Sequence, residues 1–239
     1  MKLHVSENYE IMSQNAARFI IKTIQENPQG LYCFAGGDTP VRTLQLLVEA
    51  HHNHVIDLTQ AYYIELDEWV GLDQDNPGSC LSYLKNNLFI PANIPSDHIH
   101  AFNTQAENMN DECLKANQYI EFHNGLTLTL LGVGVNGHLG FNEPGVSIDN
   151  NAHIIDLDET TKSVGQKYFS NQEILSQGVT LGIKQLMASK FVVVEANGKK
   201  KHHPIERVIR GDIDTMCPVT IINTHPQSHL FIDNEAKEG

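Results

Sequence analysis

Short apolar runs alternate with stretches of helical spacing along most of the chain. Apolar residues recur every three or four positions from residue 6 or 7 to residue 26, and Asn27-Pro28 ends that segment, which predicts a helix. The apolar run over 31–35 predicts a short buried strand. The same patterns predict further strands over 61–66, 126–131, 191–195 and 230–232, and further helices around 44–48, 80–88, 106–123 and 205–209.

Strands that alternate with helices are typical of a mainly parallel sheet with helices on both faces. We therefore predict an α/β, doubly wound fold. No linker, repeat or low-complexity tract interrupts residues 1–239, which predicts one domain. In such sheets ligands bind beyond the carboxyl ends of the strands. The polar motifs that follow residues 35, 66 and 131 are therefore expected to converge on one site.

The net charge of the chain restricts the kinds of partner that it can bind. Its 239 residues carry a formal net charge of −13, with 19% charged and 41% apolar residues. This composition is ordinary for a globular protein, and the acidity argues against nucleic acid, because few cations are available to neutralise phosphates. Nine of the sixteen Lys and Arg residues lie between Lys162 and Arg210. This basic region predicts either an anion site or a solvated basic face.

Cysteine spacing and the N-terminus bear on the compartment. The four cysteines lie far apart without a CxxC pair, which indicates reduced thiols in a cytosolic protein. No signal-peptide pattern and no apolar run of membrane-spanning length is present, so we predict a cytoplasmic protein without a membrane partner. The histidines at 51–54, 98–100 and 202–203 lack a third ligand at metal-site spacing, so no metal is predicted.

The segment 132–144, Gly-Val-Gly-Val-Asn-Gly-His-Leu-Gly-Phe-Asn-Glu-Pro, follows a predicted strand and is the most informative stretch of the chain. Glycines allow tight turns and close approach to a ligand. His138, with Glu143 five residues later, offers a proton shuttle and a carboxylate to orient it. Residues 132–137 also match G-x-G-x-x-G, but a nicotinamide fingerprint needs a helix there, and Gly140 and Pro144 interrupt one.

The loop Gly36-Gly37-Asp38-Thr39-Pro40 joins a predicted strand to a predicted helix. Free amides at a helix start, together with the Thr39 hydroxyl, suit a phosphate group. No P-loop lysine is present, which argues against a nucleoside triphosphate. An ordinary turn is the alternative for this loop. In the run 199–201, either one lysine holds a phosphate or all three form a solvated helix start.

Asp67 and Glu68 follow the predicted strand 61–66 and are adjacent in sequence. In extended structure adjacent side chains point to opposite sides, so only one of these carboxylates need enter a cleft. The alternative use of such a carboxylate is a helix cap or a loop-anchoring salt bridge. A placed carboxylate is also the residue type that proton transfer next to a carbonyl requires.

Residues 66–72, Leu-Asp-Glu-Trp-Val-Gly-Leu, together with 132–144 closely resemble the glucosamine-6-phosphate deaminases, and the galactosamine-6-phosphate deaminases look similar. The likeness runs nearly end to end, through 36–40, 167–169, 197–201 and 221–225. It implies a Rossmann-like fold and conversion of an amino sugar 6-phosphate and water into a ketose 6-phosphate and ammonia. It implies no metal and no organic cofactor.

The resemblance also implies catalytic roles. By position, Asp67 is the base that moves a proton between C2 and C1, His138 assists opening of the sugar ring, and Glu143 orients His138. Asn136 stands where many members have Asp. Asn136 can hydrogen-bond His138 but supplies no negative charge, so the triad leans more on Glu143.

The resemblance further implies a set of substrate-binding and phosphate-binding residues, which comprises Gly36, Gly37, Thr39, Gly137, Lys167 and Lys201. Lys167 replaces a family arginine, and lysine keeps the charge but lacks the bidentate fork. The basic residues that hexameric members use for activation by N-acetylglucosamine 6-phosphate align with His153 and Ile155. This argues against that control and against the hexamer, and it leaves monomer or homo-oligomer open.

Two other functions compete with the deaminase. A 6-phosphogluconolactonase, an ester hydrolase of the same fold, typically has Arg after the Asp-Glu pair, where this chain has Trp69. A non-catalytic sugar-phosphate sensor usually carries a DNA-binding domain and need not keep Asp67, His138 and Glu143 together. Because Trp69 and the segment 78–80 resemble the galactosamine branch, both glucosamine and galactosamine stay open as the sugar.

Overall fold

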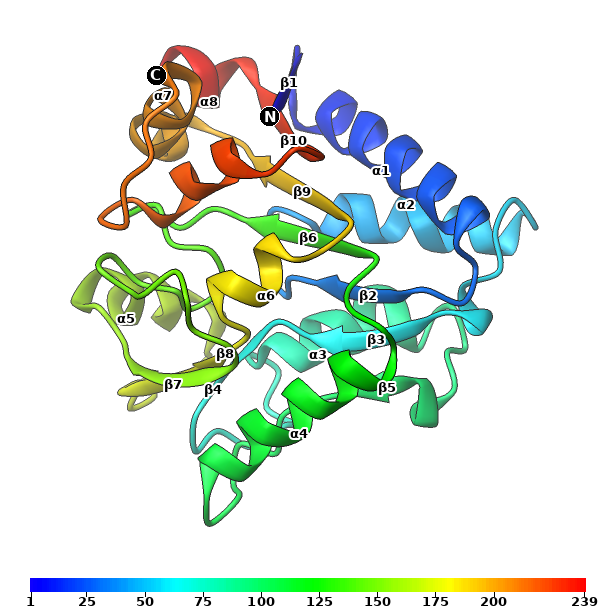
Figure 1. Ribbon diagram of the computed structural model, residues 1–239, viewed down its shortest axis with the longest axis vertical. Helices are drawn as coiled ribbons and strands as arrows, with labels where there is room; N and C mark the ends of the chain where they lie inside the picture. Colours follow the sequence, from blue (N-terminus) through cyan, green and yellow to red (C-terminus); the bar gives the residue numbers. More distant parts are fainter.

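The computed structural model describes residues 1–239 and is organised around a seven-stranded sheet whose neighbouring strands are all parallel (Figure 1). The predicted α/β, mainly parallel architecture is confirmed. In spatial order, the strands are β1 (Lys2–Ser6), β10 (Ser228–Asp233), β9 (Phe191–Ala196), β6 (Leu128–Gly132), β2 (Leu31–Phe34), β3 (Tyr62–Glu65) and β5 (Ile99–His100).

Helices cover both faces of this sheet, as a doubly wound fold requires. One face carries α1 (Tyr9–Glu26), α2 (Val41–His52) and α3 (Cys80–Leu84). The other face carries α4 (Met109–Phe122), α6 (Ile183–Met187), α7 (His202–Arg210) and α8 (Asn234–Glu238). Short 3-10 segments complete the chain: η1 (Leu58–Gln60), η3 (Ser96–His98), η4 (Gln166–Tyr168), η5 (Lys199–Lys201) and η6 (Pro218–Thr224).

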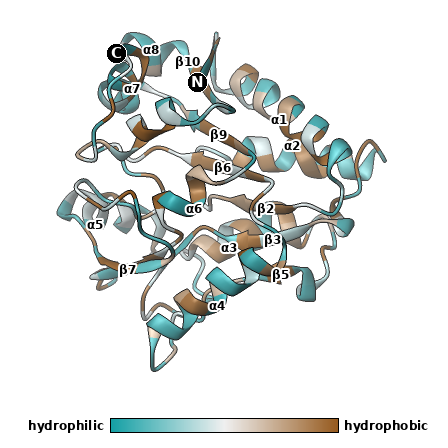
Figure 2. Ribbon diagram, in the orientation of Figure 1, coloured by the Kyte–Doolittle hydropathy of each residue, from teal (hydrophilic) through white to brown (hydrophobic).

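The inner strands of the central sheet are largely apolar because both of their faces are covered. In β2, Leu31 and Cys33 belong to the core under α4 and α7, whereas Tyr32 and Phe34 belong to the core under α1 and α2. Figure 2 shows the central strands as the most hydrophobic part of the molecule, with hydrophilic residues on the outer sides of the helices. This continuous apolar pattern is why the sequence predicted the central strands well.

A second, three-stranded antiparallel sheet lies beside the carboxyl ends of the central strands, next to α5 (Glu159–Gly165) (Figure 1). It consists of β4 (Asp67–Trp69), β8 (Gln177–Thr180) and β7 (His153–Asp156). This sheet was not predicted from the sequence, whose apolar pattern predicts one strand over 61–66. The chain instead leaves the central sheet after Glu65 and enters the second sheet at Asp67.

Other differences concern element ends. The edge strand β1 was not predicted, because four of its five side chains are at least partly exposed and no apolar run marks it. Helix α1 begins after Asn8 and α4 begins after Asn108, since each asparagine side chain accepts a backbone N–H of the first turn. The predicted helix over 80–88 is α3 followed by the π-turn η2 (Lys85–Phe89). No helix combines the length and apolarity that crossing a membrane requires.

Candidate active site

A cleft of roughly 750 Å³ opens at the carboxyl ends of the central strands. It is bounded by the segments that follow β2, β6 and β9, by β4, and by α5 with η4. The predicted site residues that line it are Gly36, Gly37, Thr39, Asp67, Asn136, His138, Lys167 and Lys201. Motifs from distant parts of the chain therefore meet in one cavity, at the place that the strand ends predicted.

Asp67 and Glu68 point to opposite sides of β4. Asp67 lines the cleft, whereas the Glu68 carboxylate accepts the backbone N–H groups of Trp69, Cys80 and Leu81 at 2.9–3.0 Å. Two of those amides belong to the first turn of α3. Glu68 therefore anchors α3 against β4, which is the structural alternative that the sequence offered for this pair.

The surroundings of Asp67 favour its protonated form. The side chain is only 7% exposed. Burial, and next the nearby Glu68 carboxylate, raise the pKa of Asp67 well above its ordinary value. A carboxylate that is ionised in such a place binds a proton strongly, which is the property of an effective general base.

His138 belongs to a tight hydrogen-bonded turn. Its Nδ1 lies 3.3 Å from Glu143 Oε2 and 3.1 Å from the hydroxyl of Thr161. Its backbone N–H donates to Asn136 Oδ1 at 3.2 Å, and Asn136 Nδ2 donates to Glu143 Oε2 at 2.9 Å. Asn136 thus bridges the histidine backbone and the glutamate carboxylate, and the amide does so without a charge.

Glu143 stands behind the cleft wall and reaches the cleft through His138. It is 5% exposed and does not line the cavity. Burial alone raises its pKa, but hydrogen bonds from His138, Thr161 and Asn136 outweigh burial and lower the pKa below its ordinary value. Glu143 is therefore an ionised acceptor that fixes the imidazole, in line with the predicted orienting role.

Steric contacts explain why two positions of this turn are glycine. A Cβ on Gly134 would lie 2.4 Å from His138 Nε2, so the imidazole occupies the space that a side chain would fill. Gly137 has φ = 88°, and its Cβ would meet the sulfur of Cys217 at 2.6 Å. Gly137 does not line the cleft, and its N–H donates to the Gly134 carbonyl. Gly137 therefore shapes the turn, and its predicted contact with substrate stays a prediction.

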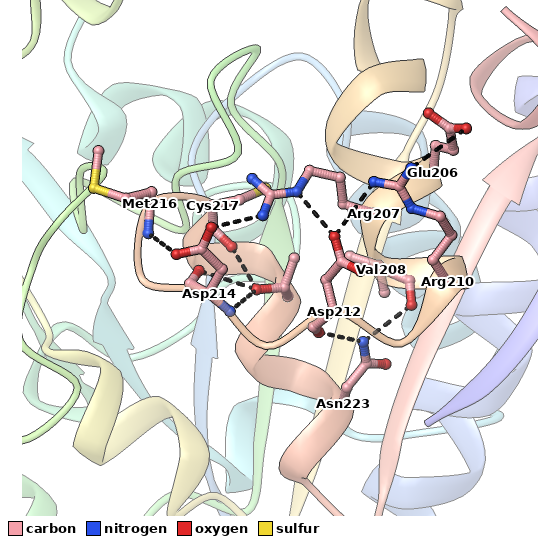
Figure 3. A network of polar contacts seen from close by, with 10 residues as sticks. Glu206, Arg207, Val208, Arg210, Asp212, Asp214, Met216, Cys217 and Asn223 are labelled. Atoms are coloured by element: carbon pink, nitrogen blue, oxygen red, sulfur yellow. Dashed lines mark hydrogen bonds and ion pairs between the residues drawn. The ribbon is translucent and has the colours of Figure 1, made fainter.

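A polar network centred on Arg207 joins α7 to the loop 211–217 (Figure 3). Arg207 donates to Asp212 at 3.1 Å and to Asp214 at 2.6 Å, and Asp214 accepts the backbone N–H of Met216 at 2.9 Å. These bonds fix the loop 211–217. The segment that follows donates from the Val219 N–H to the Gly137 carbonyl at 2.8 Å. The turn that carries His138 thus rests on a rigid support.

The loop 36–40 presents unpaired amides to the cleft. The N–H groups of Gly36, Gly37 and Thr39 donate to no protein acceptor, and the first turn of α2 contains no acidic residue. The Thr39 hydroxyl donates to Asn197 Oδ1 at 3.2 Å, and the Tyr9 hydroxyl donates to the Thr39 carbonyl at 3.0 Å. Free amides held in place at a helix start form an anion site.

Two lysines face this loop in different states. Lys201 forms no ion pair and no hydrogen bond through its ammonium group; burial, and next the charge of Lys167, lower its pKa to about 8. Lys167 instead pairs with Asp38 at 2.6 Å. Four of the nine basic residues between 162 and 210 line the cleft, namely Lys167, Lys199, Lys200 and Lys201. The basic region therefore provides cations to the cavity, although the other five lie elsewhere.

Sequence reasoning missed the roles of four residues that shape the site: Tyr9, Asp38, Thr161 and Asn197. Tyr9 and Asn197 hold the loop 36–40, Asp38 pairs with Lys167, and Thr161 contacts His138. Asp38 and Asn197 were visible only as parts of loop motifs. All four make their contacts across 23 to 158 positions of sequence, so no local pattern announces these roles.

Comparisons with known proteins agree with this geometry. A family model described as glucosamine-6-phosphate isomerases/6-phosphogluconolactonase matches residues 7–231. The glucosamine-6-phosphate deaminase of Thermoanaerobacter pseudethanolicus is 36% identical, over 99% of this chain and 94% of its own. That of Alkaliphilus metalliredigens is also 36% identical, over 99% and 98% of the two chains.

Solved structures give the same result. A monomeric glucosamine-6-phosphate deaminase superposes with a TM-score of 0.95 at 30% identity, over 99% of this chain and 98% of its own. The 6-phosphogluconolactonase of Thermotoga maritima superposes with a TM-score of 0.78 at 20% identity, over 98% and 99%, and at that identity it shares the fold alone. With a matched model over most of its length and relatives above 30% identity, the chain belongs to the family of glucosamine-6-phosphate isomerases and 6-phosphogluconolactonases.

Proposed function

We propose that this protein is an isomerising deaminase of amino sugar 6-phosphates. It converts glucosamine 6-phosphate or galactosamine 6-phosphate, with one water, into the ketose 6-phosphate and ammonia. The single observation that carries the proposal is the composition of one cleft. A buried carboxylate and a carboxylate-bound imidazole share that cleft with three unpaired amides and a partly buried lysine.

The first step is opening of the sugar ring. His138 moves a proton to the ring oxygen as the C1 hydroxyl loses its own, which breaks the C1–O5 bond and gives the aldehyde. An imidazole suits this exchange because it gives and recovers a proton near neutral pH. Glu143 holds Nδ1 from behind, so the opposite nitrogen, Nε2, is the one that works on the substrate.

The second step moves a proton between neighbouring carbons. Asp67 removes the proton from C2 of the open-chain amino aldehyde, and the electron pair moves onto the C1 oxygen, which takes up a proton from solvent to give an enaminol. The same carboxyl then returns the proton to C1, which leaves an iminium at C2. Water adds to that carbon and ammonia leaves, giving the ketose. The buried, strongly basic Asp67 matches the demand of the carbon-acid step.

The phosphate group places the reacting carbons. The amides of Gly36, Gly37 and Thr39 donate to its oxygens from one side, and Lys201 faces it from the other. Binding energy from a group that does not react positions C2 against the base. Lys201 has no anionic partner in the free protein, which supports its assignment to the substrate's phosphate.

The test is release of ammonia by the purified protein from glucosamine 6-phosphate and galactosamine 6-phosphate, with 6-phosphogluconolactone as a third substrate. We expect ammonia and the ketose 6-phosphate in equal amounts from at least one amino sugar, and the ratio of kcat/KM names the sugar. Glucosamine without phosphate serves as the control and should react far more slowly. Lactone hydrolysis without ammonia release would replace the deaminase with the lactonase.

The compartment follows from the thiols and the substrate class. All four cysteines are free and buried, as in proteins of reducing compartments. We therefore assign the protein to the cytoplasm, where phosphorylated sugars are handled. Fractionation of the producing cells, with activity followed by ammonia release, tests this assignment.

A further inference from the structure

His138 Nδ1 has two oxygen partners rather than one. The Thr161 hydroxyl lies 3.1 Å away and Glu143 Oε2 lies 3.3 Å away. Thr161 belongs to α5, whereas Glu143 belongs to the same turn as the histidine. Thr161 is only 5% exposed and lines the cleft beside the imidazole. The nearer of the two partners therefore comes from a different element of the fold.

The chemistry of the three groups permits one consistent arrangement. An ionised carboxylate only accepts hydrogen bonds, whereas a hydroxyl both donates and accepts. A hydrogen on Nδ1 is then shared between Glu143 and Thr161, and the Thr161 hydroxyl donates to the carboxylate. The lowered pKa of Glu143, to which Thr161 contributes, agrees with this arrangement. Nε2 keeps its lone pair and lies over Gly134 in the cleft wall.

The arrangement restricts the imidazole in two ways. A single carboxylate bond at 3.3 Å permits the ring to swing about the Nδ1–oxygen direction. A second partner on another element removes that freedom and holds the hydrogen on Nδ1. Because the neutral ring has one donor and one acceptor nitrogen, fixing Nδ1 as the donor fixes Nε2 as the acceptor.

We propose that Thr161 is a positioning residue for His138, whose hydroxyl sets the tautomer and the ring orientation used in opening the sugar ring. The inference rests on the proposed function for its kinetic consequence, but its structural part concerns the imidazole alone. Thr161 acts by positioning His138 and not by contacting the substrate.

The kinetic experiment compares Thr161→Val, which keeps the shape and removes the hydroxyl, with Thr161→Ser, which keeps the hydroxyl. We expect Thr161→Val to lower kcat about tenfold to a hundredfold, as part of the roughly 10²- to 10⁴-fold that acid–base catalysis contributes. KM should change less than about threefold, and Thr161→Ser should regain most of kcat. An open-chain analogue without the ring oxygen should lose far less, because it needs no ring opening.

A matched control is Thr23→Val, another buried helical threonine, whose hydroxyl donates to the Phe19 carbonyl of its own helix. It should leave kcat unchanged, so that a loss in Thr161→Val is not the general cost of removing a buried hydroxyl. Equal losses with cyclic and open-chain substrates, or no rescue by serine, would assign Thr161 a purely structural role and overturn the proposal.

A second measurement needs no activity. Nitrogen-15 NMR of labelled histidine reports which ring nitrogen of His138 carries the hydrogen. We expect the Nδ1–H tautomer in the natural protein and in Thr161→Ser, and a mixture of tautomers in Thr161→Val. An unchanged tautomer in Thr161→Val would refute the proposal even if the protein is an active deaminase. A changed tautomer in a protein that releases no ammonia would sustain it and reject the proposed function instead.

Discussion

The proton-transfer end of the cleft and its phosphate end differ in how many of their polar groups already have partners. At the end that we assign to proton transfer, comprising Asp67, His138 and Glu143, the Glu143 carboxylate and His138 Nδ1 are hydrogen-bonded to each other and to Asn136 and Thr161, whereas Asp67 and His138 Nε2 face the cleft. At the end that we assign to the phosphate, comprising the loop 36–40 with Lys167 and Lys201, three amides and the ammonium of the partly buried Lys201 have no partner. The orientation of His138 is therefore fixed before substrate binds, whereas the donors of the phosphate end gain their partner from the substrate.

This difference separates two kinds of work. A preorganised acid–base group needs no rearrangement when charge develops, so its contribution appears in kcat. Unpaired donors gain their partner when an anion binds, so their contribution appears first in KM. Substitutions at the two ends should therefore fall into two kinetic classes, and each of the following experiments tests that division.

The largest effect is expected for Asp67→Asn. The amide cannot remove the C2 proton, so kcat and solvent exchange of that proton should fall about 10³-fold. Binding of a phosphorylated, unreactive analogue, measured by calorimetry, should stay within about threefold, because the phosphate end is untouched. Asp97→Asn, which alters an exposed aspartate outside the cleft, is the control.

Stability distinguishes this loss from unfolding. Burial and Glu68 raise the pKa of Asp67, so the folded chain keeps a proton that the unfolded chain releases, and the free energy of unfolding falls as the pH rises above the ordinary aspartate range. The uncharged amide of the Asp67→Asn variant carries no such cost, so thermal denaturation at pH 7 should occur at a higher temperature in the variant. An inactive protein that is also less stable would indicate damage to the fold and not loss of a base.

The next effect concerns His138→Gln, which keeps a hydrogen-bonding side chain without a titrating ring. We expect kcat with the cyclic substrate to fall about 10²-fold and the open-chain analogue to be affected much less. His203→Gln, which alters an exposed histidine outside the cleft, should be neutral. If both substrates are slowed equally, ring opening is not the step that His138 serves.

At the phosphate end, Lys201→Gln should raise KM roughly 10- to 100-fold with little change in kcat, the cost of one buried charge-assisted hydrogen bond of about 1.5–3 kcal/mol. The control Lys184→Gln removes an exposed lysine outside the cleft. A drop in kcat with an unchanged KM would mean that Lys201 serves the chemical steps, and it would contradict the proposed division between the two ends of the cleft.

The pH dependence of KM has a definite sign. Burial and Lys167 lower the pKa of Lys201 to about 8 in the free protein. The ammonium form binds phosphate, so KM should rise as the pH passes above about 8, where the neutral amine replaces it. Lys201→Arg stays charged in that range and should flatten the rise, even if its larger side chain weakens binding overall.

The same two regions show what sequence can and cannot predict. The motifs of both regions line one cleft, as predicted, because strand-end motifs of a parallel sheet converge on one edge and each motif is contiguous in sequence. Asp67 and Glu68 were even separated by the alternation of an extended strand, as observed. The central strands and long helices were predicted for a related reason, since two covered faces leave continuous apolar runs.

What sequence could not predict are relations between distant segments. Thr161 meets His138 across 23 positions, and Asp38 meets Lys167 across 129. The second sheet was missed because its strands have only three or four residues and β7 is partly exposed along its length. Gly137 was predicted to contact the ligand because it belongs to a predicted site motif; the structure adds that its positive φ in the turn and the nearby sulfur of Cys217 require a glycine there.

A buried carboxyl that contacts α2, the helix after the loop 36–40, should make the stability of the fold depend on pH. Glu195 lies fully buried on β9, where the Thr43 hydroxyl of α2 donates to it, and burial raises its pKa to about 8. The folded chain thus holds a proton that the unfolded chain releases near pH 4.5. The natural protein should lose about 3 kcal/mol of unfolding free energy between roughly pH 5 and pH 8 from this group.

Glu195→Gln keeps an acceptor for Thr43 and carries no charge, so its stability should be nearly independent of pH over that range. Urea unfolding of both proteins at about pH 5 and pH 8 measures the difference, with Glu7→Gln at an exposed position as the control. Parallel pH profiles for the natural protein and Glu195→Gln would mean that the carboxyl is ionised already at the lower pH.

The smallest effect tests the one ion pair that spans the phosphate end. Asp38 holds Lys167 at 2.6 Å, and both side chains are about half exposed, so the pair itself contributes little stability. Asp38→Asn removes a negative charge from the anion loop and releases the lysine. If the donors of the phosphate end gain their partner only from the substrate, this substitution should lower KM about two- to threefold at low salt. The decrease in KM should be smaller at high salt. A rise in KM would instead mean that Asp38 places Lys167 for the phosphate. Lys167→Gln, made both in the natural protein and in Asp38→Asn, distinguishes these two outcomes. If Asp38→Asn frees Lys167 to bind the phosphate, Lys167→Gln should raise KM more in Asp38→Asn than in the natural protein.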